Sequence, residues 1–469
     1  MKHTFILWII LALSVSATYG QEMLTLEQCR RLAIENNKEL KIAEAQVDRA
    51  TQERAAARTK YFPQLSAMGS YLHNGKQLEL VDYSRFDAMG AQLMPQLLPL
   101  LMKYPQVAQS LPKLMEELKG LTQVDIRNVW IGDVSLVQPV FMGGRIISYN
   151  QITAYARDLA KSMHDTKLQD VICRTDETYW QVVSLANKKK LADAYVTLLR
   201  KMDTDITAMI AAGVATKSDG LAVKVKLNEA EMAQTKVDNG LALSRMLLAQ
   251  ICGLDLSQPP ALADERIEDF AVRPTTAQAD ASEAFAHRPE LKSLELATRI
   301  YQKKEQIALA ELLPTVALTA NYLVTNPNSF HGFKKEFSGT YNVGLLVRVP
   351  LSAWWEGTYK RHAARAETVI KRLETEEVRE KVELQVNQSV YKVNEASKQL
   401  TASTRNMERA EENLRYANVG FEEGVIPALN LMEAQTAWVS ARSQLIDAQI
   451  EVKLTEVYLS KALGRLGKE

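Results

Sequence analysis

The chain of 469 residues has few cysteines and histidines, and neither type is grouped. Cys29, Cys173 and Cys252 are odd in number and far apart, which argues against a disulfide framework and favours residues buried between helices. The histidines have no metal-ligand spacing, and no phosphate-loop or nucleophile-elbow motif occurs. The sequence therefore predicts no metal, no cofactor and no enzymatic activity.

An excess of charge of one sign is also absent, since 57 basic residues face 56 acidic ones. This balance predicts no nucleic-acid partner. The run from Lys188 to Lys190 lies in a long helical segment, where a solvated helix face is the ordinary explanation. Beyond the N-terminus there is no apolar run of about 18 residues, so no single helix is expected to cross a bilayer and any crossing must use strands.

Residues 1–20 are predicted to be a secretory signal peptide. Lys2 precedes the apolar run from Phe5 to Leu13, and small or polar residues lead to Gly20. This order is typical of a cleaved export signal. The mature chain is thus expected to begin near Gln21, outside the cytoplasm, without the lipid anchor that a cysteine at the cut would indicate.

The sequence contains an internal repeat. Residues around Pro63 and Tyr71 match those around Pro314 and Tyr322, and at a smaller offset the segment at Gly213-Val214 matches Gly424-Val425. Two similar halves are predicted, residues 21–253 and 279–469, joined by a linker over 254–278. The change of offset places an insertion in the first half, at about residues 73–128.

Two segments lack both glycine and proline over an unusual length, residues 146–212 and 358–419. At 1.5 Å per residue each would form a helical rod of roughly 90 to 100 Å. Each rod is followed by a short turn, near 213–219 and 424–430, and by a helix running back. Thr216 and Asp219 resemble a capping box, and Pro427 suits a first helical position.

The return helix of the second half carries two apolar seams at helical spacing. The first comprises Leu431, Ala434, Trp438, Ala441, Leu445, Ala448, Val452, Thr455, Leu459 and Ala462. The second comprises Met432, Thr436, Val439, Ser443, Ile446, Ile450 and Val457. Two seams predict neighbours on two sides, as in a closed ring of helices, whereas an ordinary long coiled coil explains only one.

Four segments alternate between apolar and more polar residues, as membrane strands do. They are residues 65–72, 130–137, 315–324 and 340–349. Open strand edges are not tolerated in lipid, so four strands require an oligomer, unless they form a soluble patch beside the helices. Trp354 and Trp355 suit an aromatic girdle at the membrane interface, or packing at a strand-to-helix junction.

The duplicated order of helices and strands, with QPVFMGGR at Gln138–Arg145 and GVIPALN at Gly424–Asn430, resembles the TolC-like bacterial outer-membrane efflux proteins. The resemblance covers the mature chain and implies an α+β membrane protein. It implies a homotrimer, a transmembrane β-barrel of four strands per chain in outer-membrane lipid, and a long α-helical barrel in the periplasm. The implied partners are a periplasmic adaptor protein and an inner-membrane transporter of the RND or ABC type.

The resemblance also implies functional positions at the helical tips. The acidic residues that ring the periplasmic gate in the family correspond to Asn430 and Glu433, so only one carboxylate remains; the alternative is that both merely suit a first helical turn. The adaptor is expected to dock on the tips. The docking residues are Gly213, Thr216, Ser218, Asp219, Gly424, Val425 and Pro427.

The main functional hypothesis is a passive exit duct, which carries substrates from the pump and adaptor to the cell exterior. The alternative is a structural periplasmic coiled-coil protein without transport activity. Drugs, metals and proteins all stay open as substrates. For the insertion, an extracellular cap and simple packing on the barrel rim both stay open.

Overall fold

The structure is a computed structural model that describes residues 23–79, 83–266 and 272–467. The predicted signal peptide, residues 1–20, lies outside the described residues. The chain divides into two compact units. The helical unit comprises Met1–Glu53, Thr153–Tyr301 and Ala366–Glu469, and the strand unit comprises Arg54–Ile152 and Gln302–Arg365.

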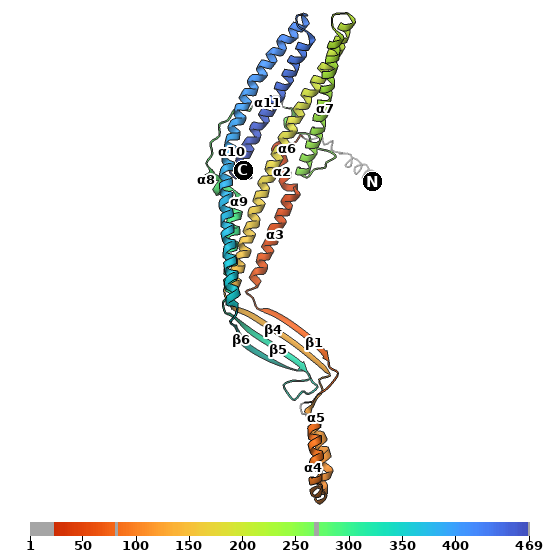
Figure 1. The fold of residues 1–469 in the computed structure, drawn as a ribbon, viewed down its shortest axis with the longest axis vertical. Coiled ribbons are helices and arrows are strands. Elements are labelled where there is room, and N and C mark those ends of the chain that lie inside the picture. Colours follow the sequence, from red (N-terminus) through yellow and green to blue (C-terminus); the bar gives the residue numbers. More distant parts are fainter. Residues whose placement is uncertain (1–22, 80–82, 267–271, 468–469) are drawn as a thin grey trace, which may run out of the picture. The chain divides into compact units, whose positions relative to one another are not determined.

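The order of helix, helix, strand, strand, helix, helix occurs twice along the chain (Figure 1). The first series is α2 Leu26–Asn36, α3 Lys38–Thr59, β1 Gln64–His73, β4 Asn128–Met142, α6 Arg145–Ala211 and α7 Lys217–Cys252. The second is α8 Ala281–His287, α9 Pro289–Ala310, β5 Thr315–Asn326, β6 Ser338–Arg348, α10 Ala353–Glu422 and α11 Ala428–Ala462. A 3-10 turn, η1 Ala263–Arg266, precedes the second series.

Both predicted rods are continuous helices. The first, α6, has 67 residues, and the second, α10, has 70. The start predicted for the second rod was wrong, because α10 begins at Ala353 and includes Gly357 and Gly420. A glycine within a helix costs only about 1 kcal/mol, which packing along a long helix overrides. Among the described residues, no helix combines the length and the apolarity that a membrane span requires.

The largest core cluster joins α2 to α6 and α7. It contains Cys29, Tyr179, Val183, Leu248 and Cys252, all buried. A capping box of Thr25 and Gln28 begins α2. From α2, the Arg30 guanidinium donates to both carboxylate oxygens of Asp176 on α6, at 2.7 and 2.6 Å. The short N-terminal helix is therefore held by apolar burial and by one bidentate ion pair.

The two seams of α11 face two different neighbours, as predicted. Ala441, Leu445 and Val452 of the first seam are buried against Leu400 and Met407 of α10. Residues of the second seam face the other hairpin: Ile450 joins the α6 and α7 cluster. Within this helical unit α11 thus has helices on two sides, which a two-stranded coiled coil does not provide.

The main sheet of the strand unit is antiparallel and has the strand order β1-β4-β5-β6. All four predicted strands are confirmed. β1 and β4 extend beyond the predicted ranges at both ends and β5 at its C-terminal end, whereas β6 begins earlier than predicted, at Ser338, and ends at Arg348 instead of Val349. The outer strands, β1 and β6, each have one paired side, and among the described residues no further strand covers their other edges. The sheet is therefore open at both edges within one chain.

The register divides the sheet into two chemically different faces. One face carries exposed apolar side chains, among them Leu65 of β1, Leu318 of β5 and Leu345 of β6. The strand register places these residues on the same side of the sheet, and Leu318 is paired directly with Leu345. On the other face a polar row crosses all four strands, from Ser66 through Ser135 and Asn321 to Asn342. The hydroxyls of Ser66 and Ser135 are 2.7 Å apart, and the Asn321 amide donates to Asn342 at 3.0 Å.

The insertion forms two helices between the strands of a two-stranded ribbon. Its elements are β2 Leu78–Glu79, α4 Tyr83–Lys103, α5 Pro105–Thr122 and β3 Gln123–Val124. The sequence did not predict these helices, because Pro95, Pro99 and Pro112 lie inside them and proline ordinarily ends a helix. Many of their apolar side chains are exposed, including Leu100 and Met102.

Candidate functional site

The tip of the first hairpin, Gly213–Asp219, is a hydrogen-bonded turn. Gly213 has a φ of +76°, a left-handed conformation that glycine adopts without strain. The Val214 and Ala215 amides both donate to the Met209 carbonyl, which closes the end of α6. Thr216 and Asp219 form the predicted capping box, and hydrogen bonds from Thr216 lower the pKa of Asp219 below its ordinary value.

The tip of the second hairpin, Gly424–Asn430, repeats the left-handed turn without the side-chain cap. Gly424 has a φ of +71°, and the Val425 and Ile426 amides donate to the Gly420 carbonyl. Pro427 is the N-cap of α11 rather than its first helical residue, so that prediction was wrong by one position. Its ψ of 155° is extended, which is the conformation of a residue just outside the helix.

Beneath the turns, the two hairpins share one apolar cluster. Ile206 of α6 and Val223 of α7 are buried together with Ala428, Leu431 and Met432 of α11. The tips therefore lie next to one another at the same end of the helical unit. At the turns themselves apolar side chains are left uncovered, since Val214 is 70% exposed and Val425 is 77% exposed.

Asn430 and Glu433 line one open depression of about 520 Å³ between α10 and α11. Both side chains are exposed. The α10 side of the depression carries Asn413 and Tyr416, which the sequence did not single out. The Arg415 guanidinium lies 4.7 Å from the Tyr416 ring centroid and pairs with Glu412. The wall therefore combines polar and aromatic side chains with aliphatic ones such as Ile426, and α11 contributes one carboxylate.

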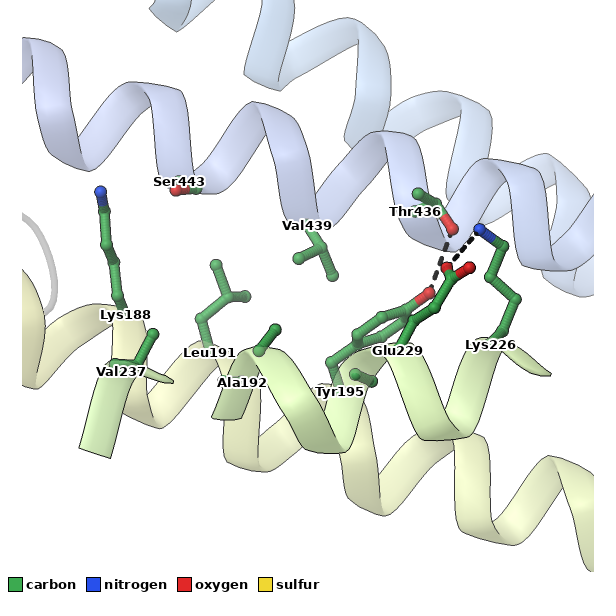
Figure 2. A pocket seen from close by; sticks show the side chains of 12 residues that line it. Lys188, Leu191, Ala192, Tyr195, Lys226, Glu229, Val237, Thr436, Val439 and Ser443 are labelled. Atoms are coloured by element: carbon green, nitrogen blue, oxygen red, sulfur yellow. Dashed lines mark hydrogen bonds and ion pairs between the residues drawn. The ribbon is translucent and has the colours of Figure 1, made fainter. Parts of the chain in front are cut away.

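A second recess, of about 280 Å³, lies between the two hairpins, farther from the turns than the apolar cluster (Figure 2). Its walls are mainly aliphatic, with Leu191 of α6 opposite Val439 of α11. Tyr195 bridges the recess, its hydroxyl 3.0 Å from that of Thr436. Lys226 donates to Glu229 at 2.8 Å along α7. The α11 wall of the recess is formed by Thr436, Val439 and Ser443 of the second predicted seam. No sequence motif marked the walls that α6 and α7 contribute.

Trp354 and Trp355 lie in the first turn of α10 and are 62% and 84% exposed. Within the described chain neither ring is buried at the strand-to-helix junction. In the part of the chain that the structure describes, no three His, Cys, Asp or Glu side chains converge as a metal site would need. The candidate functional features of the described chain are therefore surfaces: the helical tips, the depression at Asn430 and Glu433, and a sheet with one apolar face.

Paired helical hairpins and an open sheet with one exposed apolar face are features expected of an outer-membrane channel protein. Comparison with known proteins agrees. The chain belongs to the outer membrane efflux protein family, whose model matches residues 30–254 and 281–465. It is therefore an outer-membrane efflux protein, as the resemblance predicted.

The relatives are distant in sequence and close in fold. Protein CyaE of Bordetella pertussis is 23% identical over 377 residues, covering 78% of this chain and 77% of CyaE. Outer membrane protein TolC of Vibrio cholerae is 22% identical over 344 residues, covering 72% of this chain and 77% of TolC. The CmeC outer membrane channel of Campylobacter jejuni has a TM-score of 0.74 at 12% identity, covering 94% of this chain and 85% of CmeC.

Proposed function

We propose that this chain is one subunit of a trimeric exit duct, which passively conducts substrates from an inner-membrane pump and a periplasmic adaptor to the cell exterior. The observation that carries the proposal is the sheet, whose two faces differ in polarity and whose two edges are open. An exposed apolar face suits lipid, and the opposite row of Ser66, Ser135, Asn321 and Asn342 suits a water-filled lumen.

The open edges of β1 and β6 call for further copies of the chain. Unpaired backbone groups in lipid cost several kcal/mol each, so a sheet in the membrane must close on itself. Four strands are too few for closure, since known barrels have at least about eight. Three copies joined from β6 to β1 give a closed barrel, and the number three rests on the resemblance to TolC-like proteins. Trp354 and Trp355 then form an aromatic girdle at the membrane interface.

In this assembly the helical hairpins form a second barrel that extends through the periplasm. The tips, with Thr216, Ser218 and Asp219 on one hairpin and Pro427 on the other, are the docking surface for the adaptor. Uncovered Val214 and Val425 support this role, because apolar side chains at a turn gain free energy when a partner covers them. The pump is of the RND or ABC type, and the substrate class is open among drugs, metals and proteins.

Assembly and conduction can be tested on protein extracted from outer membranes. We expect a species about three times the chain mass by native mass spectrometry, heat-modifiable in gels, that opens discrete conductance steps in planar bilayers. A structural coiled-coil protein without transport activity would fractionate with the periplasm, would not insert, and would contradict the proposal.

The gate proposal concerns Glu433, which a threefold axis would repeat three times around the entrance. A ring of carboxylates creates a negative potential that favours cations. Glu433→Gln is expected to lower the cation-to-anion permeability ratio, and Asn430→Asp is expected to raise it by adding a second ring. Glu376→Gln, an exposed glutamate earlier on α10, serves as the control. Equal permeability ratios in all four proteins would remove the gate assignment and leave the alternative that both residues merely suit the N-terminal part of a helix.

A further inference from the structure

Cys29 and Cys252 lie next to one another although the whole first hairpin separates them in the sequence. Cys29 is in α2, and Cys252 is the last residue of α7. Both side chains are fully buried, and the Cys252 thiol donates to the Cys29 carbonyl oxygen over 3.5 Å. The sequence predicted buried cysteines between helices, which is confirmed, but their spacing gave no sign that two of them meet.

The two thiols act on one another directly. The hydrogen bond between the side chains is the main cause that raises the pKa of Cys29 above its ordinary range and lowers the pKa of Cys252. Rotation about the Cα–Cβ bond moves each sulfur between staggered positions, so neighbouring cysteine side chains can reorient toward one another. The Cys252 sulfur lies 3.5 Å from the Cys29 carbonyl oxygen, and both side chains are packed in the same core cluster.

The backbone on both sides of the pair is fixed. The side-chain amide of Asn37, at the end of α2, donates to the Ile251 backbone carbonyl at 3.3 Å. Gly253 caps α7, and its amide is bonded to the Ala249 and Gln250 carbonyls. Leu248 and Ile251 are buried in the same cluster as both cysteines. The packing of α2 against the end of α7 therefore holds the two cysteines side by side without a covalent bond.

The periplasm provides oxidising conditions in which a disulfide can form. An outer-membrane protein reaches its site through the periplasm, which is oxidising, and paired cysteines in such compartments form disulfides. A metal site is the other common use of paired thiols, but in the described residues no third His, Cys, Asp or Glu joins the pair. The surroundings are apolar side chains, which suit a buried disulfide.

We propose that Cys29 and Cys252 form an intramolecular disulfide in the mature protein. The two thiols lose two protons and two electrons as the S–S bond forms. The acceptor is the disulfide of a periplasmic thiol–disulfide oxidant, which is reduced to two thiols through a mixed-disulfide intermediate. Because both sulfurs are buried in the folded chain, the oxidant must form the mixed disulfide with one cysteine before α2 closes over the end of α7; closure then brings the second thiol to displace the oxidant.

Such a bond would fasten α2 to the end of the first hairpin and close a loop that contains β1, the insertion, β4, α6 and α7. Cross-linking residues this distant restricts the unfolded chain strongly, which favours the folded state. Cys173 lies apart from the pair, on α6, with its thiol directed to Glu177 at 3.7 Å. It should stay reduced and so provides an internal reference.

The test counts thiols in the unaltered protein. Outer membranes are extracted in denaturant with N-ethylmaleimide and no reductant, and the intact chain is weighed by mass spectrometry. We expect one maleimide per chain without reduction and three after reduction. The unreduced chain should also run faster in a denaturing gel, because the closed loop makes it more compact.

Variants identify the partners. Cys173→Ser should keep the mobility difference and carry no maleimide before reduction. Cys29→Ser and Cys252→Ser should each lose the mobility difference and carry two maleimides with or without reduction. Three maleimides on the unreduced wild type would overturn the proposal. So would a reduction-sensitive species of twice the chain mass, which would mean bonding between chains.

Discussion

The ion pair between Arg30 and Asp176 shows how a single residue secures the short helix α2. The Asp176 side chain is fully buried, and burial raises its pKa even though Arg30 acts in the opposite direction. Arg30→Leu is expected to destabilise the helical unit by about 3–5 kcal/mol, because it leaves a buried carboxylate unpaired. Thermal unfolding of the detergent-extracted protein would measure this loss.

The matched control for that change is the double variant Arg30→Leu/Asp176→Leu. Removing both charges is expected to recover most of the stability, since apolar residues of similar volume often replace a buried ion pair without loss. If the single variant unfolds at the wild-type temperature, the pair contributes nothing and α2 is held by its apolar contacts alone.

Lys188, Lys189 and Lys190 illustrate what residue spacing does not reveal. The sequence favoured a solvated helix face, but the three side chains reach three different partners. Lys188 pairs with Asp447 of α11 at 2.6 Å, Lys189 pairs with Asp238 of α7, and Lys190 donates to the Glu265 carbonyl at 2.8 Å. Consecutive helical residues point about 100° apart, so a run of three can reach neighbours on several sides.

At the scale of elements, positions in the seams of α11 tolerate larger side chains less well than exposed positions of the same helix. Ala441 is buried against α10, whereas Gln444 is exposed. Ala441→Leu is expected to cost about 1–3 kcal/mol by overpacking the first seam. Gln444→Leu adds an apolar residue at an exposed position of the same helix and should change the unfolding temperature little. Equal effects of the two changes would contradict the seam assignment.

The sheet offers a matched pair of adjacent leucines on β6. Leu345 belongs to the apolar face and Leu346 to the face of the polar row. If the first face contacts lipid, Leu345→Arg should cost about 2–4 kcal/mol and reduce the heat-modifiable form in outer membranes. Leu346→Arg would face water and should assemble normally, with altered ion selectivity in bilayers. The opposite ranking would mean that the lumen and lipid faces are exchanged.

At the scale of the whole molecule, the open question about the insertion is whether it caps the barrel mouth or packs on the barrel rim. The helices α4 and α5 expose apolar side chains such as Leu100 and Met102, which packing between copies would cover. Deleting residues 88–123 should raise single-channel conductance and the uptake of large antibiotics if the insertion caps the barrel mouth. An unchanged conductance with a lower unfolding temperature would instead favour packing on the rim.

Much of this architecture could be predicted from the sequence because it depends on local rules. The absence of glycine and proline predicts α6 and most of α10, alternation predicts the four strands, and Gly213 and Gly424 mark the turns. The spacing of Thr216 and Asp219 predicts the capping box. Each of these signals is carried by neighbouring residues, whose backbone geometry constrains them directly.

Only the tertiary structure decided which distant residues meet. It brought Cys29 to Cys252, aligned Ser66, Ser135, Asn321 and Asn342 into one row, and set Tyr416 opposite Glu433 across a depression. A periodic pattern states that a face is buried, but it does not state what buries it. Partner choice depends on how whole helices and strands pack, and the sequence alone therefore predicted the elements of this protein and left their contacts open.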